Sequence, residues 1–260
     1  MTGRTVLLAI DVGNTQTVVG LHADGRWISS WRLATDSACT PDELEVKMND
    51  FFTFHKIDVT IIDTVIIASV VPPLTSAWAN LARMISNARI LTVGPGIKTG
   101  LSVGILHPHE LGADRIANAV GAAELYGAPV IVVDFGTATN LDVVTAEGVY
   151  KGGVISPGIA TSADALFRHA ARLSAVDLEA PAHALGTSTL TAVQSGLIFG
   201  EAAKVDGLVN RIWNELGYKT KVIATGGLMD LVSRYCECID ESNGMLTLEG
   251  LRVIAQRNLK

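Results

Sequence analysis

The chain has 260 residues, of which 48% are hydrophobic, enough to bury a core as one large domain or two small ones. Only 18% of the residues are charged and the formal net charge is -6, so charge gives no basis for binding nucleic acid. No apolar run approaches the roughly 18 residues of a membrane helix, and the run before Asp11 is too short for a secretory signal. We therefore expect no nucleic-acid partner and no membrane partner.

The first half of the chain reads as three strands, a helix, a buried strand, a second helix and a short strand. Thr40-Pro41 followed by Glu43 is typical of a helix start with a capping box. The run DTVIIASVV is continuously apolar and rich in β-branched residues, as in a central parallel strand. The predicted elements span residues 6–10, 17–21, 27–33, 40–55, 63–71, 74–85 and 90–93.

The order of elements restarts after residue 127. A helix over 110–126 is predicted to end the first half, and three strands again open the second. Thr191 and Gln194 match a capping box for a long helix that reaches about Leu216. The remaining predicted elements are strands at 130–133, 141–144, 149–155 and 221–224, and a helix at 162–173.

Two stretches of the chain are nearly alike. LLAIDVGNTQTVVGL begins at Leu7 and VIVVDFGTATNLDVV begins at Val130, so the aligned aspartates, Asp11 and Asp134, lie about half the chain apart. Each stretch opens the first hairpin of a predicted β-β-β-α-β-α unit. This repetition indicates a duplicated fold with a boundary near Gly127, giving halves 1–127 and 128–260.

The paired motif suits a phosphate-bearing ligand. An aspartate that closes an apolar strand is costly unless something offsets its charge, and the glycine two residues later lets the backbone lie close to a ligand. Exposed N–H groups of the turn suit phosphate, and a divalent cation, usually magnesium, would relieve the repulsion between carboxylate and phosphate. Two such loops facing each other across a cleft would hold a triphosphate from both sides.

A plainer interpretation stays open for each motif alone. A single D-x-G turn after a strand is a common β-turn, and Gly226-Gly227 after the fourth strand of the second half can be a turn before a helix. The matched pair favours a nucleotide site. In that case, adenosine would lie against the bare backbone of Gly226 and Gly227.

Asp114 and Arg115 lie near the start of the predicted helix 110–126. A carboxylate within hydrogen-bond reach of a hydroxyl can accept its proton as the hydroxyl attacks a phosphoryl group. The helix dipole would favour the ionised form of Asp114, and Arg115 supplies a cation for a bound carboxylate. The alternative is a solvated helix cap.

The chain contains three cysteines, an odd number that favours reduced thiols and a cytoplasmic location over a disulfide framework. Cys236 and Cys238 form a C-x-C pair. No second Cys or His cluster in the sequence completes a metal site around them, so we expect none there.

Seven motifs occur in order over nearly the whole chain: DVGNT, WRLATDSACTPDE, HELGADRIANAVGA, DFGTAT, GGVISPGI, QSG and ATGGL. Together they resemble the type III pantothenate kinases of the acetate and sugar kinase/Hsp70/actin superfamily. The resemblance implies an α/β fold, a duplicated ribonuclease-H-like (actin-like ATPase) architecture with mixed five-stranded sheets flanked by helices and a cleft between the halves. It also implies a homodimer that phosphorylates pantothenate with ATP, the first step towards coenzyme A, using Mg²⁺ and a monovalent cation, K⁺ or NH₄⁺.

The resemblance also assigns roles to individual residues. Asp11 would lie near magnesium and Asp134 would hold the monovalent cation, while Asp114 would be the general base. The residues expected to contact ATP are Asp11, Val12, Gly13, Asn14, Thr15, Gln16, Thr17 and Thr137, with Gly226 and Gly227 added from the pattern above. The residues expected to contact pantothenate are Gly112, Ala113, Asp114, Arg115 and Thr189.

The chain departs from the family pattern in four places: Ile105 replaces a tyrosine, Ser188 an asparagine and Asn140 a threonine, and LSAV from Leu173 replaces a common LPxV. Two other functions remain as alternatives. One is another small-molecule kinase of the same superfamily, because the phosphate-binding clamp does not choose the acceptor. The other is a regulator that binds nucleotide without turnover.

Overall fold

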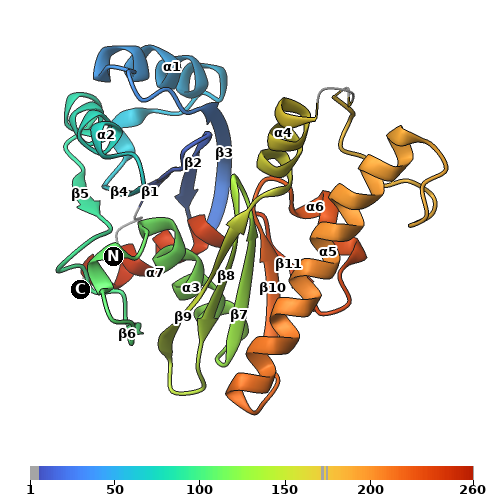
Figure 1. The fold of residues 1–260 in the computed structure, drawn as a ribbon. Coiled ribbons are helices and arrows are strands. Elements are labelled where there is room, and N and C mark those ends of the chain that lie inside the picture. Colours follow the sequence, from blue (N-terminus) through green and yellow to red (C-terminus); the bar gives the residue numbers. More distant parts are fainter. Residues whose placement is uncertain (1–5, 171–172, 174, 260) are drawn as a thin grey trace. The chain divides into compact units, whose positions relative to one another are not determined.

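The computed structural model describes residues 6–170, 173 and 175–259 (Figure 1). Contacts divide the chain into two compact units. The first unit comprises Met1–Leu101, Leu106–Glu124 and Leu246–Lys260, and the second comprises Ser102–Ile105 and Leu125–Met245. This division differs from a split at residue 127, because the C-terminal segment joins the first unit and Ser102–Ile105 joins the second.

The first unit is built on a five-stranded mixed sheet in the order β3-β2-β1-β4-β5. β1 pairs with β2 antiparallel and with β4 parallel, and β4 continues parallel to β5. The strands are β1 (Leu7–Val12), β2 (Gln16–Ala23), β3 (Arg26–Ala34), β4 (Thr64–Ser69) and β5 (Arg89–Thr92).

Helices cover both faces of this sheet. Helices α1 (Pro41–Phe54) and α2 (Pro72–Ile85) pack on one face, where Met48, Phe52 and Trp78 join the alternate residues of β1 and β4 in one core. On the other face, α7 (Leu246–Leu259) packs against β1 and β4. Burial on both faces explains why these two strands are continuously apolar.

The second unit repeats the topology in the order β11-β10-β7-β8-β9-β6, with β7–β8 and β8–β9 antiparallel and β7–β10 and β10–β11 parallel. The hydrophobic core of the second unit combines side chains of β7, β8 and β10 with those of helices α4, α5 and α6. The strands are β6 (Ser102–Val103), β7 (Val130–Phe135), β8 (Ala138–Val144), β9 (Val149–Pro157), β10 (Lys221–Thr225) and β11 (Glu241–Ser242). The helices are α4 (Ile159–His169), α5 (Thr189–Leu216) and α6 (Met229–Val232).

The predicted five strands per sheet therefore hold for the first unit and not for the second. The sixth strand, β6, precedes the duplicated part of the second unit and pairs parallel with β9 at the edge of the sheet. A two-residue strand carries no periodicity that a sequence pattern could reveal. Without it, the two sheets match strand for strand.

Helix starts were predicted with mixed success. The Thr40–Glu43 capping box is confirmed, since Glu43 N donates to Thr40 Oγ1 at 3.3 Å and Thr40 N donates to Glu43 Oε2 at 2.8 Å. The Thr191–Gln194 box is wrong, because Ser188 caps α5 and pairs with Thr191. Of the helix predicted at 162–173, α4 covers the part up to His169, and residues 171 and 172 lie outside the described residues.

The helix predicted over 110–126 begins later than expected. A 3-10 turn, Pro108–Glu110, comes first, and α3 spans Ala113–Tyr126. Asp114 is therefore the second residue of α3.

The C-terminal helix was not predicted, and glycines bring it close to α3. A side chain at Gly250 would overlap the carbonyl of Ala117, and a Cβ at Gly121 would lie 2.6 Å from the carbonyl of Leu246. Thr247 Oγ1 also donates to the buried Asn118 at 2.7 Å. The two helices thus approach with backbone against backbone, which places α7 in the first unit.

We expect Gly250→Ala to reduce the free energy of unfolding by about 2 kcal/mol or more, because the added methyl group must push α3 and α7 apart. Urea denaturation monitored by circular dichroism measures the change. Gly207→Ala is the matched control: Gly207 is exposed within α5 and has open space around it, so the substitution should stabilise by about 0.5–1 kcal/mol. Equal stability of Gly250→Ala and the wild type would contradict the close crossing.

Candidate functional site

The first loop, residues 11–17, turns sharply between β1 and β2. Gly13 N donates to Gln16 O at 3.0 Å, and a Cβ at Gly13 would lie 2.9 Å from that same oxygen. Asn14, Thr15 and Gln16 are exposed, and Asp11 is partly buried at the strand end. The loop therefore presents amide, hydroxyl and backbone groups to solvent beside a carboxylate.

Val12 and Thr17, two of the residues predicted to contact ATP, are buried and hold the loop in place. The side chain of Val12 is buried, and its carbonyl accepts a hydrogen bond from Val70 N at 3.0 Å. Thr17 is 2% exposed, and its hydroxyl lies 2.9 Å from that of Thr35, whose N–H donates to Thr15 O at 2.9 Å. Thr17 and Thr35 together attach the loop to the end of β3.

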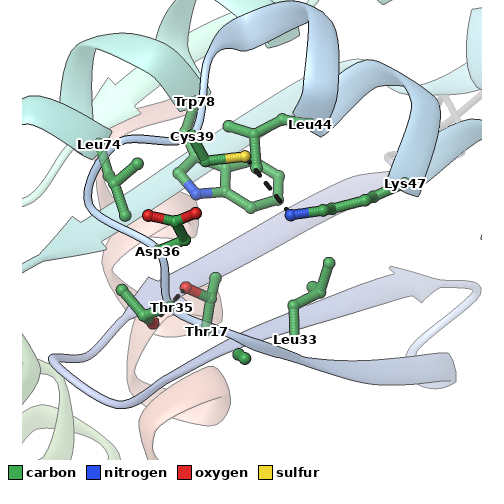
Figure 2. Close-up of a pocket in the computed structure, with 10 residues that line it drawn as sticks. Thr17, Leu33, Thr35, Asp36, Cys39, Leu44, Lys47, Leu74 and Trp78 are labelled. Atoms are coloured by element: carbon green, nitrogen blue, oxygen red, sulfur yellow. Dashed lines mark hydrogen bonds between the residues drawn. The ribbon is translucent and has the colours of Figure 1, made fainter.

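A small pocket lies against this attachment (Figure 2). Its free volume of about 10 Å³ is close to that of one water molecule, so the pocket is far too small for a nucleotide. Trp78 is 1% exposed, and its indole N–H has no hydrogen-bond partner among the described residues. The lining residues are Thr17, Leu33, Ala34, Thr35, Asp36, Cys39, Leu44, Lys47, Leu74 and Trp78.

The Asp114 segment lies beside the first loop within the same unit. The Cβ that Gly112 lacks would be 3.6 Å from Val70, the residue whose N–H binds Val12. The same Cβ would overlap Asp114 Oδ1, so glycine leaves the space that this carboxylate needs. Asp114 Oδ1 accepts the N–H of Arg115 at 2.8 Å. The chain segments carrying Asp11 and Asp114 thus both lie against Val70, just beyond the carboxyl end of β4.

Burial raises the pKa of the Asp114 carboxyl above its ordinary value of 3.8. The N–H and the positive charge of Arg115 act in the opposite direction and do not offset the loss of solvation. The N–H groups at the helix start do favour the ionised form, as expected, but burial outweighs them.

The second loop, residues 134–139, is the corresponding hairpin of the second unit, with a turn one residue shorter than that of the first loop. Gly136 N donates to Ala138 O at 3.0 Å, and Thr137 is exposed at the tip. Gly158 N and Thr161 Oγ1 both donate to Thr137 O, at 3.1 and 2.7 Å. A side chain at Gly158 would overlap the carbonyl of Gly136. The end of β9 and the start of α4 therefore hold this loop.

The structure brings Gly226 against Asp134. Thr225 and Asp134 are register partners in the parallel pair β10–β7, and a Cβ at Gly226 would overlap Asp134 Oδ1. Gly226 has a φ of 97°, which favours glycine. Leu228 N closes the turn on Phe135 O at 3.0 Å. Asp134, Thr137 and Gly226 thus share the carboxyl edge of the second sheet, and the exposed Gly227 follows Gly226.

The remaining predicted residues divide between the units. Ala113 is buried and Arg115 is partly exposed in the first unit, whereas Thr189 is the exposed first residue of α5 in the second. The two-sided clamp formed by both loops stays a prediction.

Each loop offers a donor set that fits magnesium better than a soft metal. In the described part of the chain, no three His, Cys, Asp or Glu side chains gather in a metal-binding group. A single carboxylate with solvent-facing hydroxyls suits a cation that keeps waters and phosphate oxygens as its other ligands. Burial raises the pKa of Cys236 to about 12 and that of Cys238 further, which keeps both free thiols protonated.

Comparison with known proteins agrees with this geometry. The family model for type III pantothenate kinases matches residues 7–211. A type III pantothenate kinase of Myxococcus xanthus (strain DK1622) is 44% identical over 253 residues, covering 97% of this chain and 99% of the relative. The chain belongs to the type III pantothenate kinase family.

Solved structures place this pantothenate kinase family member in the actin-like ATPase fold. Component A of (R)-2-hydroxyglutaryl-CoA dehydratase from Acidaminococcus fermentans superposes with a TM-score of 0.58 at 13% identity, covering 98% of this chain and 99% of that one. MreB 5 of Spiroplasma citri bound to AMPPNP gives 0.56 at 10% identity, with 98% of both chains covered. No helix among the described residues is long and apolar enough to span a membrane.

Sequence reasoning missed the residues that hold the two loops in this family member. Thr35 lies in the motif WRLATDSACTPDE and Gly158 in GGVISPGI, both of which were recognised without a role. Thr161 and Glu201 lie outside the quoted motifs. Their contacts join segments far apart in the chain, so no local pattern pointed to them.

We expect Asp114→Asn to melt at a higher temperature than the wild type near pH 7.5, because asparagine avoids the cost of a buried charge. An unfolded aspartate ionises near 3.8, below the raised pKa of folded Asp114. The increase in melting temperature should therefore be complete above the pKa of folded Asp114. It should shrink as pH falls through that pKa and vanish below the pKa of the unfolded aspartate. Calorimetry across this pH range measures it.

Asp58→Asn provides a control of opposite sign. The hydroxyl and N–H of Thr60 lower the pKa of Asp58, so its carboxylate stabilises the fold at neutral pH. The asparagine variant should melt lower than the wild type, and the difference should vanish in acid. A lower melting temperature for Asp114→Asn at neutral pH would contradict the assigned burial.

Proposed function

We propose that this protein phosphorylates pantothenate with ATP, the first step of coenzyme A synthesis. The carrying observation is that a protein of this family holds Asp114, a carboxylate whose pKa is raised by burial, beside the first loop. A raised pKa increases the affinity of the carboxylate for a proton, which is what a general base requires.

In the proposed reaction, the hydroxyl oxygen of pantothenate attacks the γ-phosphorus of ATP and forms the new P–O bond. The bond from the γ-phosphorus to the oxygen that bridges it to the β-phosphorus breaks, and ADP leaves with that electron pair. Asp114 accepts the hydroxyl proton at a carboxylate oxygen. Arg115 offers a cation for the pantothenate carboxylate, and Gly112, Ala113 and Thr189 line the acceptor site.

The two loops are proposed to bind ATP from the two units. The exposed turn Asn14–Gln16 would contact phosphates, Thr137 would do so from the second loop, and Gly226-Gly227 would face adenosine. Asp11 would hold magnesium, which supplies positive charge against the phosphates, and Asp134 would hold K⁺ or NH₄⁺. Val12 and Thr17 act here through backbone and packing.

Family membership also supports a homodimer and a cytoplasmic enzyme as further parts of this proposal. The three free cysteines are consistent with a reducing compartment.

A coupled ADP-release assay tests the proposed function. We expect turnover with pantothenate and ATP that requires magnesium and increases with potassium. Turnover only with another small alcohol or carboxylate would support a different kinase of the superfamily. ATP binding without turnover of any acceptor would support a regulator, and both results would contradict the proposal.

Asp114→Asn should reduce kcat by at least about 10²-fold while ATP binding persists, because the hydroxyl proton loses its acceptor. In the wild type, kcat/KM should fall with acid at a pH above the ordinary aspartate value, in line with the raised pKa. Steady-state kinetics across pH and calorimetric titration with ATP measure both effects. Undiminished turnover in the variant would remove Asp114 from this role.

A further inference from the structure

A buried carboxylate on α5 is joined to one end of the second loop and, through Lys204, to the segment that supports the tip of that loop. Glu201 is 6% exposed, and its Oε1 accepts a hydrogen bond of 2.6 Å from the hydroxyl of Thr139. Its other oxygen, Oε2, accepts from Lys204 Nζ at 2.8 Å. The ammonium of Lys204 also donates to the carbonyl of Pro157 at 3.0 Å.

These contacts are made with residues that belong to the loop or lie next to the residue that supports it. Thr139 is the last loop residue and pairs with Phe135 across the hairpin. Pro157 precedes Gly158, whose N–H binds the carbonyl of Thr137. Glu201 and Lys204 therefore connect the descending side of the hairpin to the segment that holds its tip.

The duplication supplies a comparison for Thr139. In the first unit Thr17 closes the hairpin opposite Val12, as Thr139 does opposite Phe135. Both threonines are buried and both hydroxyls are hydrogen-bonded. Thr17 is attached to a neutral hydroxyl on a neighbouring segment, whereas Thr139 is attached to an ionisable side chain on a 28-residue helix.

A carboxylate costs more to bury than the hydroxyl that serves the equivalent position, so packing alone does not account for it. Lys204 offsets that cost, and the charge-assisted bond from Thr139 holds the hydrogen-bonding geometry more tightly than a neutral one. A strong attachment matters here because the loop that Thr139 ends also carries Asp134 and Thr137, which must keep a fixed position relative to a ligand.

We propose that Glu201 is a positioning residue for the second phosphate loop: through Thr139 and Lys204 it fixes the loop that carries Asp134 and Thr137. The inference rests on the proposed function, in which this loop contacts ATP and the monovalent cation. Glu201 itself touches neither ligand.

The test combines Glu201→Gln and Thr139→Val. The first keeps an acceptor for the hydroxyl and removes the ion pair, and the second removes the hydroxyl with little change of shape. Each should raise the KM for ATP and the potassium concentration for half-maximal activation by about tenfold, the lower end of effects seen for residues that orient a ligand-binding group. The KM for pantothenate should change little.

The double variant should raise the KM for ATP by less than the product of the two single effects, because both substitutions break one connection. Lys204→Met should act in the same direction through Pro157. Thermal melting of all variants establishes that they are folded under assay conditions.

Asp206→Asn is the matched control. Asp206 lies on the same helix, and its carboxylate accepts the N–H groups of Glu237 and Cys238 at 2.9–3.0 Å, away from the loop contacts. This variant should lower the melting temperature without raising the KM for ATP. If Glu201→Gln and Thr139→Val behave as this control does, Glu201 is purely structural and the inference is overturned.

Failure of the proposed function is distinguishable from failure of this inference. If the wild type turns over no pantothenate but binds ATP, titration calorimetry replaces KM, and Glu201→Gln should raise the Kd for ATP about tenfold. An unchanged Kd would overturn the inference. If the wild type binds no ATP, both the inference and the proposed function are wrong.

Discussion

In each unit, a carboxylate ends a buried parallel strand, and the surrounding structure is arranged around that constraint. β1 is covered on both faces by helices, β7 packs against helices in the core of the second unit, and both strands are flanked on both edges by other strands, so their apolar runs exclude water. Asp11 and Asp134 lie near the ends of these strands, where they are partly buried, and each is followed two residues later by a glycine of the hairpin turn. A partly buried carboxylate at such a position destabilises the fold, and binding of a ligand there can offset this loss of stability.

The two loops share a sequence motif and have different supports. A hydroxyl pair holds Thr17 in the first unit, while an ion pair on α5 holds Thr139 in the second. The glycines are also used differently: Gly13 permits the first turn, and Gly158 and Gly226 let neighbouring segments approach the second from outside. Both copies therefore keep the aspartate and the glycine two residues later, whereas the second turn is one residue shorter and the contacts that support each turn differ.

Asp114 shows the same conflict between stability and function in a stronger form. Its burial opposes ionisation, and Gly112 gives up a side chain to make room for it. A carboxylate of this kind weakens the fold and, in the proposed role of Asp114, would make a stronger base, which is the usual exchange at a catalytic position. The backbone N–H and the positive charge of Arg115 limit the cost without removing it.

The sequence by itself determined the family, the duplicated topology and nearly every strand, because apolar runs, turn glycines and the two aspartate motifs are local signals with a fixed spacing. It also indicated the acidic residues at the strand ends, since charge at the end of an apolar run is visible without a fold. Only the tertiary structure decided that α7 joins the first unit, that burial outweighs the helix start at Asp114, and that Thr35 and Glu201 support the loops. Each of these depends on contacts between residues far apart in the chain or on how much solvent a group loses, and neither quantity is carried by a local pattern of residues.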